Sequence, residues 1–69
     1  MIPPNHEMSN RQHQILMLIA KGHKSQDIAD HLGLSVHTVN NHRKNMLKRT
    51  GCRSSSELIM WGVKKGLIP

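Results

Sequence analysis

Four glycines divide this sequence into segments of the length of short α-helices, and that spacing restricts the fold more than any other feature. Each glycine follows a run in which apolar residues recur at helical intervals, and helices commonly end at such a residue. The four are Gly22, Gly33, Gly51 and Gly66. We therefore predict helices over about 10–21, 25–32, 36–50 and 55–65.

Serines at the starts of these segments support the predicted bounds, because a serine hydroxyl can accept a hydrogen bond from a free amide of the first helical turn. The predicted N-caps are Ser9, Ser25, Ser35 and Ser54. Gln12 and Glu57 stand three residues after the first and last of these serines. That is the spacing of a capping box.

The apolar residues favour an all-α fold. The 69 residues include one Trp and no Phe or Tyr, so aromatic and β-branched residues are too sparse for several strands. We expect a compact four-helix domain over residues 9–69. Residues 1–8 are expected to form a flexible tail or linker, from which Met8 could pack on the domain.

Two residues of the last predicted helix leave alternatives open. Gly62 lies inside a helix, where glycine costs about 1 kcal/mol relative to Ala, so it either allows a close helix–helix contact or is tolerated at the surface. Trp61 is either a core residue, which we favour, or an exposed anchor for a dimer.

The short connection between the second and third predicted helices indicates a helix-turn-helix motif. The segment "HLGLS" offers Gly33 to end one helix, Leu34 to bury in the corner and Ser35 to begin the next. Two helices joined by so short a turn containing glycine are typical of this motif. Its second helix lies in the major groove of DNA.

The distribution of charge favours a nucleic acid as partner. Ten Lys and Arg face four Asp and Glu, a net charge of +6. No acidic residue lies between Asp30 and Glu57, yet that interval contains Arg43, Lys44, Lys48, Arg49 and Arg53. A solvated surface usually mixes both signs, so we interpret this interval as a surface for a polyanion.

The third predicted helix has one apolar and one polar side at 100° per residue. The apolar side carries Val36, Val39, Met46, Leu47 and Thr50, and the polar side carries His37, Thr38, Asn41, Lys44, Asn45 and Lys48. Asn can bond adenine through two atoms, Lys favours guanine, and either can bind phosphate instead. Arg43 projects toward the apolar side, so we expect its stem to lie along the surface and its guanidinium to reach a phosphate or water.

The segments "SNRQHQILMLIAKGHKSQDIADHLGLSVHTVNNHRKNM" and "ELIMWGVKKGLI" resemble the LuxR-type (GerE-like) helix-turn-helix family of bacterial transcription regulators. The most specific part, "IADHLGLSVHTVNNH", is close to the family pattern IA-x-x-L-x-(I/L)-S-x-x-TV-x-x-H. The resemblance covers roughly residues 8–68. It implies binding to double-stranded DNA, usually as a dimer, and usually as the C-terminal output domain of a response regulator or ligand-sensing activator. RNA polymerase is a further partner to consider.

The resemblance also assigns roles to particular positions. It implies base contacts from Asn40, Asn41 and Lys44. The resemblance and the basic residues of the third helix together give a set of residues that we expect to contact phosphate or to stabilise the helix-turn-helix. They are Lys24, Ser25, Ser35, Thr38, His42, Arg43, Lys48 and Arg49. Dimer contacts in the family commonly come from the fourth helix, here Leu58, Ile59, Met60, Gly62 and Val63.

Three departures from the family pattern affect what can be carried over. Gln12 stands where the family usually has Glu, and Ser55 stands where an Arg is common. Asn40 stands where a basic base-reading residue is often found. The DNA sequences that better-known family members bind therefore do not predict the one that this chain binds.

Other classes of function find little support. His37 and His42 are five residues apart, which does not place them on one helical face, and no Cys or carboxylate completes a metal site. Cys52 has no sequence partner that marks it as a nucleophile. We expect no cofactor, no metal and no enzymatic activity.

Two alternatives within binding proteins stay open. One is a protein-interaction module that retains the helix-turn-helix shape, although it predicts acidic or apolar residues on the outward side of the third helix. The other is a promoter-binding domain like region 4 of a sigma factor. No secretory signal or membrane-spanning run is evident, so we expect a bacterial, cytoplasmic, nucleoid-associated protein.

Overall fold

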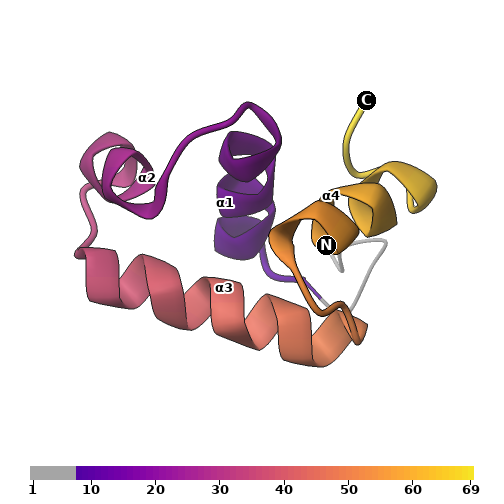
Figure 1. Cartoon of the computed structure of the whole chain (residues 1–69). Helices are drawn as coiled ribbons and strands as arrows, with labels where there is room; N and C mark the ends of the chain where they lie inside the picture. The colour runs from indigo at the N-terminus through magenta and orange to yellow at the C-terminus, as the bar shows by residue number, and fades with distance from the viewer. Residues whose placement is uncertain (1–7) are drawn as a thin grey trace.

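The computed structural model describes residues 8–69, and its regular secondary structure over that range is entirely helical. The helices are α1 (Asn10–Ala20), α2 (Ser25–Leu32), α3 (Val36–Thr50) and α4 (Ser55–Lys64). In Figure 1, α1 stands between α2 and α4, and all three lie on the same side of the longer α3. The predicted all-α fold is confirmed, and each helix begins and ends within one residue of the predicted position.

Serine caps begin three of the helices as predicted. The Ser9 hydroxyl accepts from the backbone N–H of Gln12 at 3.1 Å, and the Gln12 amide oxygen accepts from the N–H of Ser9 at 3.3 Å. Ser35 and Ser54 cap α3 and α4 through their hydroxyls. These bonds satisfy amide groups that a helix start otherwise leaves without partners.

Two details of the predicted caps are wrong. Ser25 is the first residue of α2 and not its cap; Lys24 occupies the N-cap, where its N–H donates to the carboxylate of Asp27 at 3.3 Å. In α4, the Glu57 carboxylate accepts from the N–H of Arg53 rather than from that of the capping serine. In both cases an acid in the first helical turn accepts from a backbone N–H at the helix start, where the helix dipole favours negative charge.

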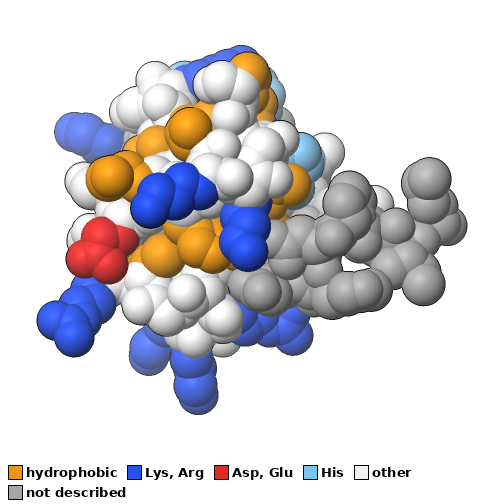
Figure 2. Space-filling view, turned by 90° about the vertical axis from the view of Figure 1, so that its right-hand side faces the viewer, with side chains coloured by type: hydrophobic (Ala, Val, Ile, Leu, Met, Phe, Trp, Pro, Cys, Tyr) orange, Lys and Arg blue, Asp and Glu red, His pale blue; other side chains and the backbone are white. Residues whose placement is uncertain are grey.

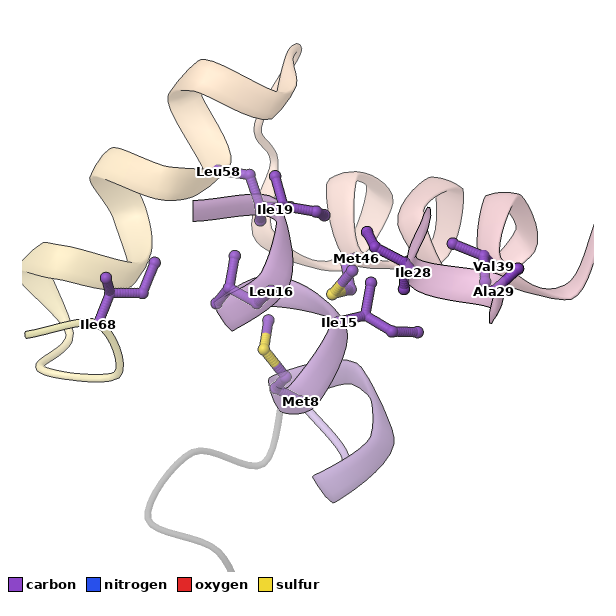
Figure 3. Close-up of a cluster of buried hydrophobic side chains, with 10 residues drawn as sticks. All are labelled: Met8, Ile15, Leu16, Ile19, Ile28, Ala29, Val39, Met46, Leu58 and Ile68. Carbon is purple, nitrogen blue, oxygen red and sulfur yellow. The ribbon is translucent and has the colours of Figure 1, made fainter. Parts of the chain in front are cut away.

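The core lies where α1 meets the other three helices, as Figure 3 shows. Its buried side chains are Met8, Ile15, Leu16, Ile19, Ile28, Ala29, Val39, Met46, Leu58 and Ile68. Aliphatic and thioether groups fill this core, in a chain that has no Phe or Tyr. Burial of such surface is the main term that favours folding, at about 25 cal/mol per Å².

Met8, the first described residue, packs on the domain. Its side chain is only 4% exposed and belongs to the core, as the expectation that Met8 could pack on the domain allowed. The rest of the predicted tail, residues 1–7, lies outside the described residues. Met8 packs because the chain turns into α1 directly after it and brings the thioether against that helix.

Gly62 is the site of a close contact and not a surface glycine. A β-carbon there would lie 2.7 Å from Cδ1 of Ile68 and 3.1 Å from Cδ2 of Leu16. Trp61 is half-buried at the edge of the core, with the Lys65 ammonium 6.0 Å from its ring centroid. The indole therefore packs on the core, as we favoured, without being enclosed by it.

The turn between α2 and α3 has the geometry of a helix-turn-helix. Gly33 ends α2 with a φ of 69°, a left-handed conformation that costs glycine little. The N–H of Leu34 donates to the carbonyl of Ala29 at 2.9 Å, and Ser35 then caps α3. Across residues 8–69, no helix combines the length and apolar content that crossing a bilayer requires.

Candidate DNA-binding surface

One side of α3 packs on the domain and the other faces away from the remaining helices (Figure 1). Val39 and Met46 on the inner side are fully buried. The three residues predicted to contact bases are all exposed: Asn41 and Lys44 on the outer side, and Asn40 at the border with α2, where Ser25 bonds to it. The structure therefore presents two amides and an ammonium together along one turn of an accessible helix.

Cations extend this outer side toward the C-terminal end of α3. Lys48 and Arg49 occupy the last turn and are exposed, as is Arg53 just beyond the helix. Cations at this end also interact favourably with the helix dipole. In Figure 2, Lys and Arg side chains project from the lower edge of the molecule, the level at which α3 lies in Figure 1.

The other predicted phosphate contacts surround the start of α3 and its flank. Lys24 and Ser35 are exposed at the starts of α2 and α3, whereas Thr38 and His42 are half-buried. The Ser35 hydroxyl donates to that of Thr38 at 2.9 Å and accepts from its backbone N–H at 3.1 Å. Thr38 thus serves the local structure of the α3 N-terminus.

The guanidinium of Arg43 is bonded within the domain, whereas we expected it to reach a phosphate or water. Its half-buried guanidinium donates from Nη1 to the hydroxyl of Ser25 at 3.3 Å and from Nη2 to the hydroxyl of Ser55. Ser25 in turn donates to Oδ1 of Asn40 at 2.7 Å. Arg43 therefore joins the starts of α2 and α4 to the middle of α3.

Sequence reasoning missed this network because its members are 12 to 18 residues apart. A signal was present in the departure at Ser55, where the family commonly has an Arg. In this chain α3 supplies the guanidinium from Arg43, and Ser55 is the small hydroxyl that accepts its hydrogen bond.

The predicted dimer residues of α4 divide into two groups. Leu58 and Gly62 are buried in the chain's own core, so neither can contribute to a surface, and their assignment is corrected. Met60 and Val63 are 62% and 51% exposed, and Ile59 is half-buried. On the face that carries α4, Figure 2 shows hydrophobic side chains interspersed with Lys and Arg.

Histidine and cysteine residues are dispersed. In the part of the chain that the structure describes, no three His, Cys, Asp or Glu side chains gather closely enough to hold a metal ion. His37 is exposed and His42 is half-buried. The thiol of Cys52 is free and half-buried.

Comparison with known protein families gives one match over most of the chain. A family model described as "Bacterial regulatory proteins, luxR family" matches residues 6–62. This interval includes all of α1, α2 and α3 and all but the last two residues of α4. It therefore contains the whole helix-turn-helix and the exposed side of α3.

Individual relatives agree with that match. The oxygen regulatory protein NreC of Staphylococcus aureus, in strains JH9 and USA300, is 39% identical over 61 residues, which are 88% of this chain. The aligned part is 28% of each relative, so this chain spans less than a third of their length. The solved structure of the transcription factor GerE superposes with a TM-score of 0.89 at 25% identity, covering 94% of this chain and 97% of that one.

Proposed function

The chain belongs to the luxR family of bacterial regulatory proteins and is a DNA-binding helix-turn-helix domain, and from that premise we propose that α3 enters the major groove of a specific duplex. Asn40, Asn41 and Lys44 contact base edges there. The observation that carries this proposal is that all three side chains are exposed on α3, a helix with one side turned away from the other helices. Amides and ammoniums are suited to the donors and acceptors that bases present in the major groove.

The phosphates on either side of the groove are bound by the surrounding residues. Lys48 and Arg49, at the end of α3, bind phosphates of one DNA strand. Lys24 and the capped start of α3 lie against phosphates of the other strand. Thr38 and His42, on the flank of α3, contribute further phosphate contacts. Because each phosphate contact releases counterions, the affinity falls as salt rises, with a slope of about 0.9 per phosphate neutralised.

The domain acts as a homodimer and as the output part of a longer regulator. Met60 and Val63 supply exposed apolar surface on α4 for a second copy, and the alignment to under a third of the NreC proteins favours a longer parent chain. Two copies would read two half-sites whose spacing follows from the dimer geometry. We place this activity at the bacterial nucleoid in the cytoplasm, in contact with the transcription machinery.

Selection of bound duplexes from a random library tests the proposal directly. We expect an enriched motif, bound at least about 1,000-fold more tightly than a scrambled duplex at physiological salt. Lys44→Ala should lose about 1–3 kcal/mol on the selected duplex and relax the preference at particular positions. Gln14→Ala, an exposed change on α1, is the matched control.

Two results would contradict the proposal. If no motif is enriched, the domain does not read sequence. If Lys44→Ala lowers affinity for the selected and scrambled duplexes by the same factor, Lys44 contacts phosphate and not a base.

A further inference from the structure

Asn40 is the only one of the three proposed base-reading residues whose side chain is hydrogen-bonded within residues 8–69. A chain of hydrogen bonds leads to it: Arg43 donates to Ser25, and Ser25 donates to Oδ1 of Asn40 at 2.7 Å. A second bond from Arg43, to Ser55, fixes the guanidinium at its other end. The side chain of Asn40 is thus oriented by residues from α2 and α4.

The direction of these hydrogen bonds follows from the chemistry of the groups. A guanidinium can only donate, so the Ser25 hydroxyl accepts from Arg43 and keeps its own hydrogen for another acceptor. In an Asn amide only the oxygen can accept that hydrogen. The positive charge on Arg43 also polarises the hydroxyl and strengthens its bond to Asn40.

We propose that Ser25 and Arg43 are positioning residues that hold Oδ1 of Asn40 toward α2 and leave its NH₂ group for the base, so that Asn40 favours bases that offer acceptors alone over adenine. This inference rests on the proposed function. Recognition of adenine by Asn uses both atoms of the amide, because adenine offers a donor at N6 and an acceptor at N7. With Oδ1 held by Ser25, the NH₂ group of Asn40 meets acceptors at N7 and O6 of guanine or at O4 of thymine, whereas in adenine the N6 donor beside N7 faces that NH₂ group unfavourably.

Asn41 provides an internal contrast. It is exposed and, within the described part of the chain, its amide makes no hydrogen bond, so both of its atoms are available to a base. Two neighbouring residues of the same type therefore have different preferences, because only one of them is held by α2. Sequence alone would assign both the adenine contact expected of Asn.

Library selection with matched variants tests this inference. Asn40→Ala identifies the base position that Asn40 reads, as the position where preference is lost. There the wild type should favour guanine or thymine over adenine by about 10-fold, the lower part of the range for one good base contact. Ser25→Ala should bring that ratio close to one and leave the other positions unchanged, since the freed amide can turn and accept from adenine.

Three further variants make the result specific. Ser25→Thr retains a donating hydroxyl and should keep the wild-type preference. Ser56→Ala, an exposed serine one residue beyond the network, should also leave it unchanged. Asn40→Asp keeps an oxygen for Ser25 but presents a second oxygen to the base, so preference at that position should switch to cytosine, which offers its N4 donor. Circular dichroism melting curves verify that each variant is folded.

The outcomes separate this inference from the proposed function. If the wild type selects a motif but prefers adenine at the Asn40 position, or if Ser25→Ala weakens all duplexes equally, the inference is overturned and the function stands. If Ser25→Ala does not fold, failure of Asn40→Asp to switch the preference overturns the inference instead. If the wild type enriches no motif, the proposed function fails and the inference fails with it.

Discussion

Gly62 and Ile68 pack so closely that a β-carbon on Gly62 would lie 2.7 Å from Cδ1 of Ile68. The backbone holds them together, because the carbonyl of Gly62 accepts from the N–H groups of Leu67 and Ile68 at 2.8 and 3.3 Å. Nε2 of His13 lies 3.0 Å from the carbonyl oxygen of Leu67 and joins α1 to the same segment. After α4, Ile68 is therefore part of the core and Leu67 packs against it.

Gly62→Ala should destabilise the domain by about 1 kcal/mol. Overpacking costs about 1–3 kcal/mol, while replacing a helical glycine by Ala returns about 1 kcal/mol, and the fully buried Leu16 has little room to move. Urea unfolding measures the change. In an Ile68→Val background, which removes the nearest atom, the same substitution should cost less; an equal cost in both backgrounds would show that Ile68 is not the obstacle.

Lys48→Ala should weaken binding to all duplexes by a similar factor and reduce the salt slope by about one unit. The reason is that Lys48 lies exposed at the C-terminal end of α3, where we place a phosphate contact. Fluorescence titration at several salt concentrations measures both quantities. Lys64→Ala removes the same charge from α4 and should leave the salt slope almost unchanged. If the two variants have equal effects, Lys48 acts only through the net charge of the protein and does not contact a phosphate.

Ser35 separates the stability of α3 from its binding to DNA. Ser35→Ala removes the N-cap and should cost about 1 kcal/mol of stability. Ser35→Asp keeps an acceptor at the cap and adds a negative charge that the helix dipole favours, so its stability should match the wild type. Near phosphates that charge is repulsive, and Ser35→Asp should therefore bind a duplex more weakly than Ser35→Ala. The same rank order in unfolding and in titration would contradict the placement of this helix start against DNA.

Val63→Glu should impair dimer formation and leave the fold intact, since Val63 is 51% exposed. Analytical ultracentrifugation and titration of a duplex with one or two half-sites measure self-association and cooperative binding. We expect the affinity for a single half-site to fall only by the amount that the added negative charge causes. Cooperativity between two half-sites should fall further. Ser56→Glu on the first turn of α4 is the control of equal charge. If Val63→Glu and Ser56→Glu behave alike, the dimer does not use this face.

The sequence by itself determined the number of helices, their bounds and the polarity of α3. These features depend on groups within about one helical turn of each other: a serine hydroxyl three residues from the amide it accepts from, or Val39 and Met46 at helical spacing. Such interactions are local, so periodicity and capping chemistry suffice to predict them. The exposure of Asn41 and Lys44 follows from the same periodicity, whereas Asn40 lies at the border between the two sides of the helix.

Only the tertiary structure decided which face of α4 is buried and what Arg43 contacts. Residues 58–63 of α4 are almost all apolar, so no sequence periodicity distinguishes Leu58, which packs on the core, from Val63, which does not. Arg43 meets Ser25 and Ser55 because α2 and α4 begin beside α3. Contacts over 12 or more residues depend on how the helices pack, and that packing brings Ser25 of α2 to the amide oxygen of Asn40.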